Sequence, residues 1–144
     1  WLINIIQAKK LAVNCLKFSI TAEQAQHYEH QCHALLSKLI ENGFETTITN
    51  VTAENFAVVR ATQPSAIQLH NELTQKLNDA EDNSKEPLQE TIAQAIEMNI
   101  TCIATGVNSA SDLAHLWQTG VPYIQGSYLQ APLSSMSYGF SDMA

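Results

Sequence analysis

Residues 100–126 contain the pattern that most restricts the fold of this chain. An apolar, β-branched run at 100–104 leads into a glycine turn and then into a segment with helical spacing. Asn108 or Ser109 is placed to cap that helix, and Gly120 is placed to end it. A second short apolar run follows. This order predicts one βαβ unit, and the short apolar runs are typical of strands buried on both sides of a parallel sheet.

The rest of the chain repeats this alternation of strands and helices. Thr21 and Gln24 fit a capping box at the start of a long helix that ends before Gly43. Its buried stripe is expected to contain Ala25, Tyr28, Cys32, Leu35, Leu36, Leu39 and Ile40. Further helices are expected at 1–8, 71–77 and 87–98, a short helix or irregular loop at 52–61, an acidic loop at 78–85, and strands at 11–20, 44–51 and 66–69. Five strands alternating with helices predict a parallel α/β fold in one domain spanning 1–144.

Composition excludes several classes of partner. The net charge is −7 and the seven basic residues are scattered, which argues against nucleic acid or an anionic membrane surface. The three cysteines have no CxxC spacing and cannot all pair, which favours a reducing, cytoplasmic compartment. No apolar run approaches the roughly 20 residues of a membrane span.

Several segments of the βαβ unit also carry a family resemblance. The segments Ala104-Thr-Gly-Val-Asn108 and Tyr123-Ile-Gln-Gly126, followed by Pro132, resemble the last βαβ unit of EAL domains, which hydrolyse the bacterial second messenger cyclic di-GMP. The sequence of residues 109–118, with 128–130 and 136–138, is similar to a degenerate branch of that family from twitching motility. The resemblance implies a TIM-type barrel. Since such a barrel needs about 250 residues, this chain is expected to be its C-terminal part, with the N-terminal strands and the E-A-L segment absent.

The resemblance also implies where catalytic groups should stand. Active EAL domains hold two divalent cations, Mg or Mn, on carboxylates at the strand ends, and a lysine assists. In this chain the matching ligand positions are all neutral and are occupied by Ser19, Thr49, Asn50, Thr105 and Asn108. Gln68 stands in place of the lysine. Neutral oxygens cannot supply the charge that two metals need, so we expect no cofactor and no phosphodiesterase activity.

A ligand site without hydrolysis is the favoured hypothesis. By resemblance, Gln125, Gly126 and Pro132 match residues of the family's nucleotide site, while Asn50, Asn108 and His70 are candidates to contact a base. Tyr123 or Tyr128 could offer a stacking face. The alternative is that Gln125 and Gly126 merely end a strand in a tight turn.

The possible roles follow from these candidates. The resemblance implies a regulatory protein that binds cyclic di-GMP, docks a protein such as a PilZ-type adaptor or a second copy, and acts in type IV pilus control. Two alternatives stay open: an interaction module that binds no nucleotide, and an active phosphodiesterase. An open partial barrel would also expose two strand edges and an apolar sheet face, which predicts dimerisation or a longer folded chain.

A histidine cluster at residues 27–33 is the remaining motif. His27, His30, His33 and Cys32 include residue types that bind metals. The three histidines spread over the exposed side of the predicted helix, whereas Cys32 belongs to its buried stripe. We therefore interpret the cluster as a solvated polar face.

Overall fold

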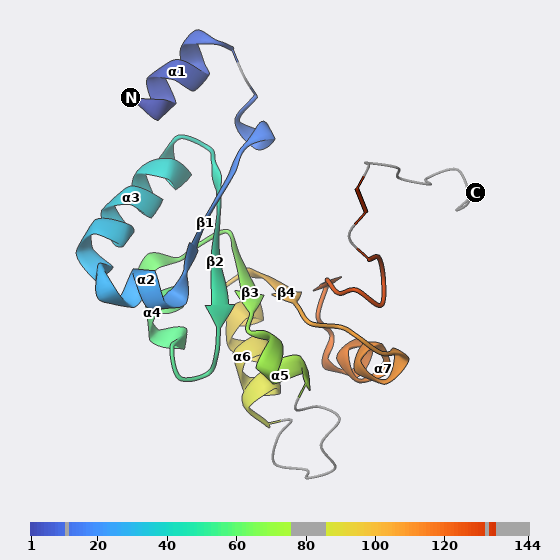
Figure 1. The fold of residues 1–144 in the computed structure, drawn as a ribbon. Helices are drawn as coiled ribbons and strands as arrows, with labels where there is room; N and C mark the ends of the chain where they lie inside the picture. Colours follow the sequence, from blue (N-terminus) through green and yellow to red (C-terminus); the bar gives the residue numbers. More distant parts are fainter. Residues whose placement is uncertain (11, 76–85, 132, 135–144) are drawn as a thin grey trace.

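One parallel sheet organises the computed structural model, which describes residues 1–10, 12–75, 86–131 and 133–134 (Figure 1). Its five strands lie in chain order. They are β1 (Lys17–Thr21), β2 (Glu45–Val51), β3 (Ala66–Leu69), β4 (Thr101–Ala104) and β5 (Tyr123–Ile124). Every neighbouring pair is parallel. Because each crossover advances by one strand without reversing, the sheet winds in one direction, as the wall of a barrel does.

Helices connect the strands. They are α1 (Leu2–Ala8), α2 (Ala22–His27), α3 (Glu29–Glu41), α4 (Phe56–Thr62), α5 (Asn71–Gln75), α6 (Glu86–Glu97) and α7 (Ala110–Thr119), with a 3₁₀ turn η1 at Val13–Cys15. One face of the sheet packs against these helices. Ile48, Ile67 and Cys102 on the strands are buried in the same core as Leu36 of α3 and Ile92 of α6. The predicted α/β alternation is therefore confirmed, and of the two alternatives at 52–61 a short helix is present, as α4, beginning at Phe56.

The opposite face of the sheet is not apolar, which corrects one expectation. Strand register aligns Lys17 with Glu45, Ser19 with Thr47, and Ala66 with Thr101 on this face. Burial alternates along β2, β3 and β4, so each strand buries one set of side chains against the helices and leaves the other set less covered. The predicted strands buried on both sides are thus half-buried, and the uncovered face is mainly polar.

The long helix predicted from Thr21 is interrupted at Tyr28. Its predicted capping box is present, since Gln24 N donates to Thr21 Oγ1 (3.1 Å) and Thr21 N donates to Gln24 Oε1 (3.3 Å). Tyr28 leaves helical geometry at φ −119°, ψ 44°, and it separates α2 from α3. Ala25 of α2 and Leu36 and Leu39 of α3 are buried as predicted, and Cys32 is half-buried against the same core. The other three members of the predicted stripe are exposed, so the buried stripe is narrower than predicted: Tyr28 (53%), Leu35 (52%) and Ile40 (38%).

Other boundaries differ modestly from the prediction. The strand expected at 11–20 begins only at Lys17, because η1 precedes it. Gly43 follows α3 with φ 81°, as expected for a residue that ends a helix. The acidic loop at 78–85 and most of the tail lie outside the described residues. No helix in the described part of the chain is long and apolar enough to cross a membrane.

Candidate functional site

The carboxyl ends of the five parallel strands meet at one edge of the sheet. The part of this edge at the ends of β2, β3, β4 and β5, which we call the rim, comprises Thr49–Asn50, Gln68–His70, Thr105–Asn108 and Gln125–Gly126. Parallel strands bring their ends together in this way, and ligand sites of barrel enzymes lie at this end. Of the six predicted site residues, Asn50, His70, Asn108, Gln125 and Gly126 lie on the rim. Pro132 lies outside the described residues.

Gln125 and Gly126 are fixed by backbone contacts to the segment after β4. Gln125 N donates to Ala104 O (2.8 Å), and Val107 N donates to Gln125 O (3.3 Å). The side chain of Gln125 accepts a hydrogen bond from Gln68 Nε2 at 3.1 Å. A Cβ on Gly126 would overlap Val107 O, so only glycine fits there. Gly126 therefore ends the strand in a tight packing contact, and Gln125 presents an oriented side-chain amide.

Asn50 and His70 lie on the neighbouring ends of β2 and β3. Asn50 is exposed and has a left-handed backbone, with φ 58°. The register between β2 and β3 shifts between Ile48 and Val51. His70 N donates to Val51 O (2.8 Å), and His70 Nδ1 accepts from Glu72 N (3.3 Å). The backbone of His70 is therefore anchored to the end of β2, one residue after Asn50, and its half-buried imidazole is held by the Glu72 amide.

The end of β4 carries neutral groups bound to other protein atoms. Thr105 Oγ1 donates to Leu69 O (2.7 Å), and Asn108 Oδ1 accepts from Ser127 Oγ (2.8 Å). Asp112 is 3% exposed, and its Oδ2 accepts from Asn108 N (2.9 Å) and Ser109 N (3.0 Å). Of the two predicted caps, Ser109 is the N-cap residue of α7. A buried carboxylate therefore stands next to the rim, where it caps a helix.

Sequence reasoning missed Asp112, Ser127 and the role of Gln68. The spacing Ser109-Ala-Ser-Asp112 is a capping-box signature and could have identified Asp112. The contacts of Gln68 and Ser127 had no local signal. They join residues that are 57 and 19 positions apart in the chain.

Possible metal ligands are few at the rim. Thr49 Oγ1 donates to Ile20 O (3.4 Å), and Ser19 is exposed. Within the part of the chain that the structure describes, no three His, Cys, Asp or Glu side chains gather in a way that could hold a metal ion. His27, His30 and His33 are exposed on α2 and α3, in agreement with a solvated face.

Buried Cys102 lies in β4 on the helix-facing side. Burial raises the pKa of its thiol to about 12. Since the thiolate is the reactive form of cysteine, this side chain is chemically inert near neutral pH.

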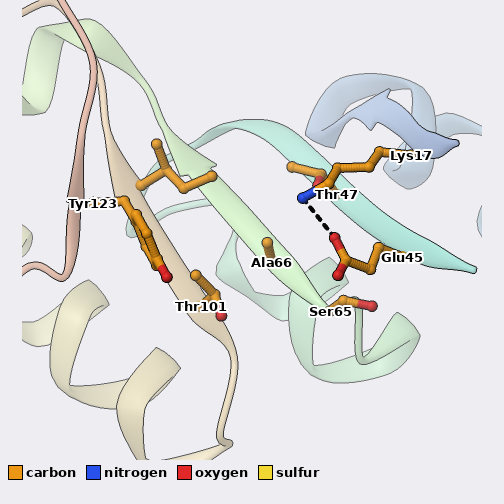
Figure 2. A pocket seen from close by; sticks show the side chains of 8 residues that line it. Lys17, Glu45, Thr47, Ser65, Ala66, Thr101 and Tyr123 are labelled. Carbon is orange, nitrogen blue, oxygen red and sulfur yellow. Dashed lines mark ion pairs between the residues drawn. The ribbon is translucent and has the colours of Figure 1, made fainter. Parts of the chain in front are cut away.

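A hollow of about 360 Å³ lies at the other end of the uncovered face, near the amino ends of the strands (Figure 2). Its lining includes Lys17, Glu45, Ser65, Thr101 and Tyr123. Lys17 Nζ lies 2.6 Å from Glu45 Oε2, and this hydrogen bond, together with the carboxylate charge, raises the pKa of Lys17. Tyr123, one of the two expected stacking residues, is therefore part of the hollow.

Comparisons with known proteins identify the family. The family model described as EAL domain matches residues 1–132, so the chain belongs to the EAL domain family. Among curated proteins, no sequence matches. The chain resembles the solved FimX EAL domain from Pseudomonas aeruginosa bound to cyclic di-GMP, with 32% identity and a TM-score of 0.86 over 97% of this chain and 58% of that one.

Two more distant structures show the same fold. The Xanthomonas citri FimX EAL domain in complex with cyclic di-GMP is 18% identical, with a TM-score of 0.81 over 96% of this chain and 55% of that one. The PaMucR phosphodiesterase complex with cyclic di-GMP is 16% identical, with a TM-score of 0.76 over 90% of this chain and 53% of that one. The expected TIM-type fold and the predicted resemblance to EAL domains are confirmed. The chain spans a little over half the length of these structures.

Proposed function

We propose that this chain is part of a cyclic di-GMP receptor that binds the nucleotide at the rim and does not hydrolyse it. One observation carries the proposal: the family's metal-ligand positions are occupied by neutral side chains, several of which are bonded to other protein groups. The Thr105 hydroxyl donates to Leu69 O, and Asn108 Oδ1 accepts from Ser127. A pair of Mg²⁺ or Mn²⁺ ions needs several converging carboxylates, and these residues do not fit such a pair.

The rim groups suit recognition of a base by hydrogen bonds. Gln125, Asn50 and Asn108 carry amides, which offer both donors and acceptors to the edge of a guanine. Gln125 Oε1 accepts from Gln68, so its amide nitrogen is the group offered to an acceptor on the ligand. Similarity to a FimX EAL domain solved with cyclic di-GMP supports this choice of ligand.

The regulatory role is a further part of the proposal. We infer that the receptor acts in the cytoplasm, because Cys15, Cys32 and Cys102 are all free thiols. Exposed apolar side chains at Trp117 (69%), Tyr128 (50%) and Leu129 (48%) support docking of a protein. The family resemblance suggests a PilZ-type adaptor or a second copy of this chain as the docked protein. It also suggests type IV pilus control as the process that the receptor regulates.

Calorimetric titration of cyclic di-GMP into the protein that contains this chain tests the proposal. The titration is run with Mg²⁺ and with a chelator, and GTP serves as the control ligand. We expect saturable binding that is the same under both conditions, with intact nucleotide recovered afterwards. Absence of heat at high micromolar cyclic di-GMP would reject nucleotide binding and favour the alternative, a protein-docking module that binds no nucleotide. Metal-dependent appearance of a linear product would overturn the proposal in favour of an active phosphodiesterase.

A further inference from the structure

The backbone of Asn50 adopts a conformation that few side chains favour. Its φ is 58°, inside β2, where the pairing with β3 shifts between Ile48 and Val51. A non-glycine residue at positive φ costs free energy unless its surroundings hold it there, and asparagine tolerates the conformation better than most. A contact is therefore needed to hold the left-handed backbone of Asn50, which is a candidate ligand residue.

The side chain of Asn55 provides that restraint. Its Nδ2 donates to Asn50 O (3.0 Å), and its Oδ1 accepts from Thr52 N (2.8 Å). Asn55 N in turn donates to Thr52 Oγ1 (3.4 Å). Both ends of one amide are thus used to close the loop between β2 and α4, and one of them holds the carbonyl of Asn50 itself.

The position of Asn55 makes this use of its amide unexpected. Asn55 is the N-cap residue of α4, where asparagine normally accepts a hydrogen bond from the first turn, yet its side chain makes no capping bond. Thr21 and Ser109, the N-cap residues of α2 and α7, both cap their helices. The amide of Asn55 therefore bonds backward, to Thr52 and Asn50, and fixes the loop that leads into α4.

The same turn of the chain also places His70. His70 N donates to Val51 O (2.8 Å), directly after the left-handed residue. A change in the backbone at Asn50 would shift this carbonyl and hence the end of β3. One restraint therefore sets the relative positions of two predicted ligand contacts that come from different strands.

We propose that Asn55 is a positioning residue for nucleotide recognition at the rim. It acts through the backbone of Asn50, which it holds in the left-handed conformation, and through Val51, which carries His70. This inference rests on the proposed function, because the rim must bind the nucleotide for the positioning to matter.

An Asn55→Asp variant tests the restraint selectively. Aspartate keeps the acceptor for Thr52 N but places a carboxylate oxygen against Asn50 O, where a donor is needed. Aspartate is also a good N-cap residue, so α4 should still form. We expect cyclic di-GMP affinity to fall about five- to tenfold, the effect of one lost hydrogen bond on a contact residue. The control is Asn42→Asp, which removes a similar bond from Asn42 Nδ2 to Lys38 O (2.7 Å) at the end of α3.

A double-mutant cycle separates positioning from a general structural role. Asn50→Gly removes the side chain but keeps the left-handed backbone accessible. The part of the effect that passes through the Asn50 side chain should disappear in the Asn50→Gly background, while the part that passes through Val51 to His70 remains, so Asn55→Asp should weaken binding less there than in the wild type. Equal losses in both backgrounds, or a loss as large in Asn42→Asp, would overturn the inference.

NMR couplings at Asn50 give a readout that is independent of binding. The HN–Hα coupling and carbon shifts should report a left-handed residue in the wild type and a changed φ in Asn55→Asp. An unchanged Asn50 in that variant would overturn the inference whatever the affinities are. If the wild type shows a left-handed Asn50 but binds no cyclic di-GMP, the proposed function fails and the ligand role of Asn55 fails with it, while the restraint itself stands.

Discussion

The two ends of the uncovered sheet face use polar side chains in different ways. At the amino ends of the strands, Lys17 and Glu45 pair across exposed surface, with side chains 69% and 52% accessible. At the rim, neutral groups are tied to the backbone or to one another: Thr105 to Leu69 O, and Gln68 to Gln125. An exposed ion pair orders little, whereas hydrogen bonds to the backbone fix a donor or acceptor in place.

This difference shows why the hollow in Figure 2 is not the preferred ligand site. Its volume is suitable for a small molecule, but its ion pair is solvent-exposed and its polar groups come from strand starts. At the rim, in contrast, the amides are oriented before a ligand arrives. Preorganised groups lose less entropy on binding, so the rim is the better candidate for specific recognition.

The largest effect that would disturb the rim is expected from Gly126→Ala. A Cβ there would overlap Val107 O, a backbone atom that cannot move without shifting the end of β4. We expect a loss of about 3 kcal/mol in the free energy of unfolding. Urea denaturation followed by circular dichroism measures it.

Gly120→Ala is the matched control for that substitution. Gly120 has φ 75°, and nothing lies within 4 Å of an added Cβ, so only the backbone conformation opposes alanine. The expected loss is about 1 kcal/mol. Equal losses for the two variants would mean that Gly126 does not pack tightly against Val107.

A smaller loss is expected from Asp112→Ala. The substitution removes the acceptor of Asn108 N and Ser109 N and leaves the start of α7 without half of its capping box. We expect a decrease of about 2 kcal/mol in the free energy of unfolding. Ser111→Ala, at an exposed position on the same helix, should change it by less than about 0.5 kcal/mol. A neutral result for Asp112→Ala would show that this carboxylate does not hold the rim beside β4.

Gln125→Ala tests recognition at the rim directly. We expect cyclic di-GMP affinity to fall about tenfold, or about 1.4 kcal/mol. Gln68→Leu should cost about threefold, since Gln68 orients the amide of Gln125 across 3.1 Å. Gln94→Ala is the control, because it removes a glutamine that accepts from Arg60 (2.6 Å) away from the rim. Unchanged affinity in Gln125→Ala would move the ligand site elsewhere.

Local signals in the sequence are enough to predict the alternation of strands and helices. The capping box at Thr21 and the glycine ends of α3 and α7 depend on neighbouring residues only, so pattern reasoning can find them. The break at Tyr28 is not predictable in this way. It occurs within a continuous helical pattern, with neither glycine nor proline at the break.

The location of the candidate site is predictable from the sequence, but its internal contacts are not. Because the ends of parallel strands must meet at one edge, the strand pattern alone groups Asn50, His70, Asn108 and Gln125. The left-handed backbone of Asn50 and the bond between Gln68 and Gln125 depend on strand register and on residues distant in the chain. The Lys17–Glu45 pair likewise requires the register of β1 with β2.

The smallest effect is expected at the ion pair of the hollow. Glu45→Gln should barely change the urea midpoint near neutral pH, and it should leave the affinity for cyclic di-GMP unchanged, because the pair is exposed and screened by salt. Glu45 raises the pKa of Lys17 above 10.5, so the small stability that the pair adds is present below that pH and disappears as the pH rises through the folded-state pKa. Any offset in urea midpoint between wild type and Glu45→Gln should therefore stay constant around neutral pH and vanish in strong base. A large gap at neutral pH would mean that the pair stabilises the fold more than an exposed pair is expected to. A loss of nucleotide affinity in Glu45→Gln would mean that the two ends of this face are coupled or that the hollow takes part in binding.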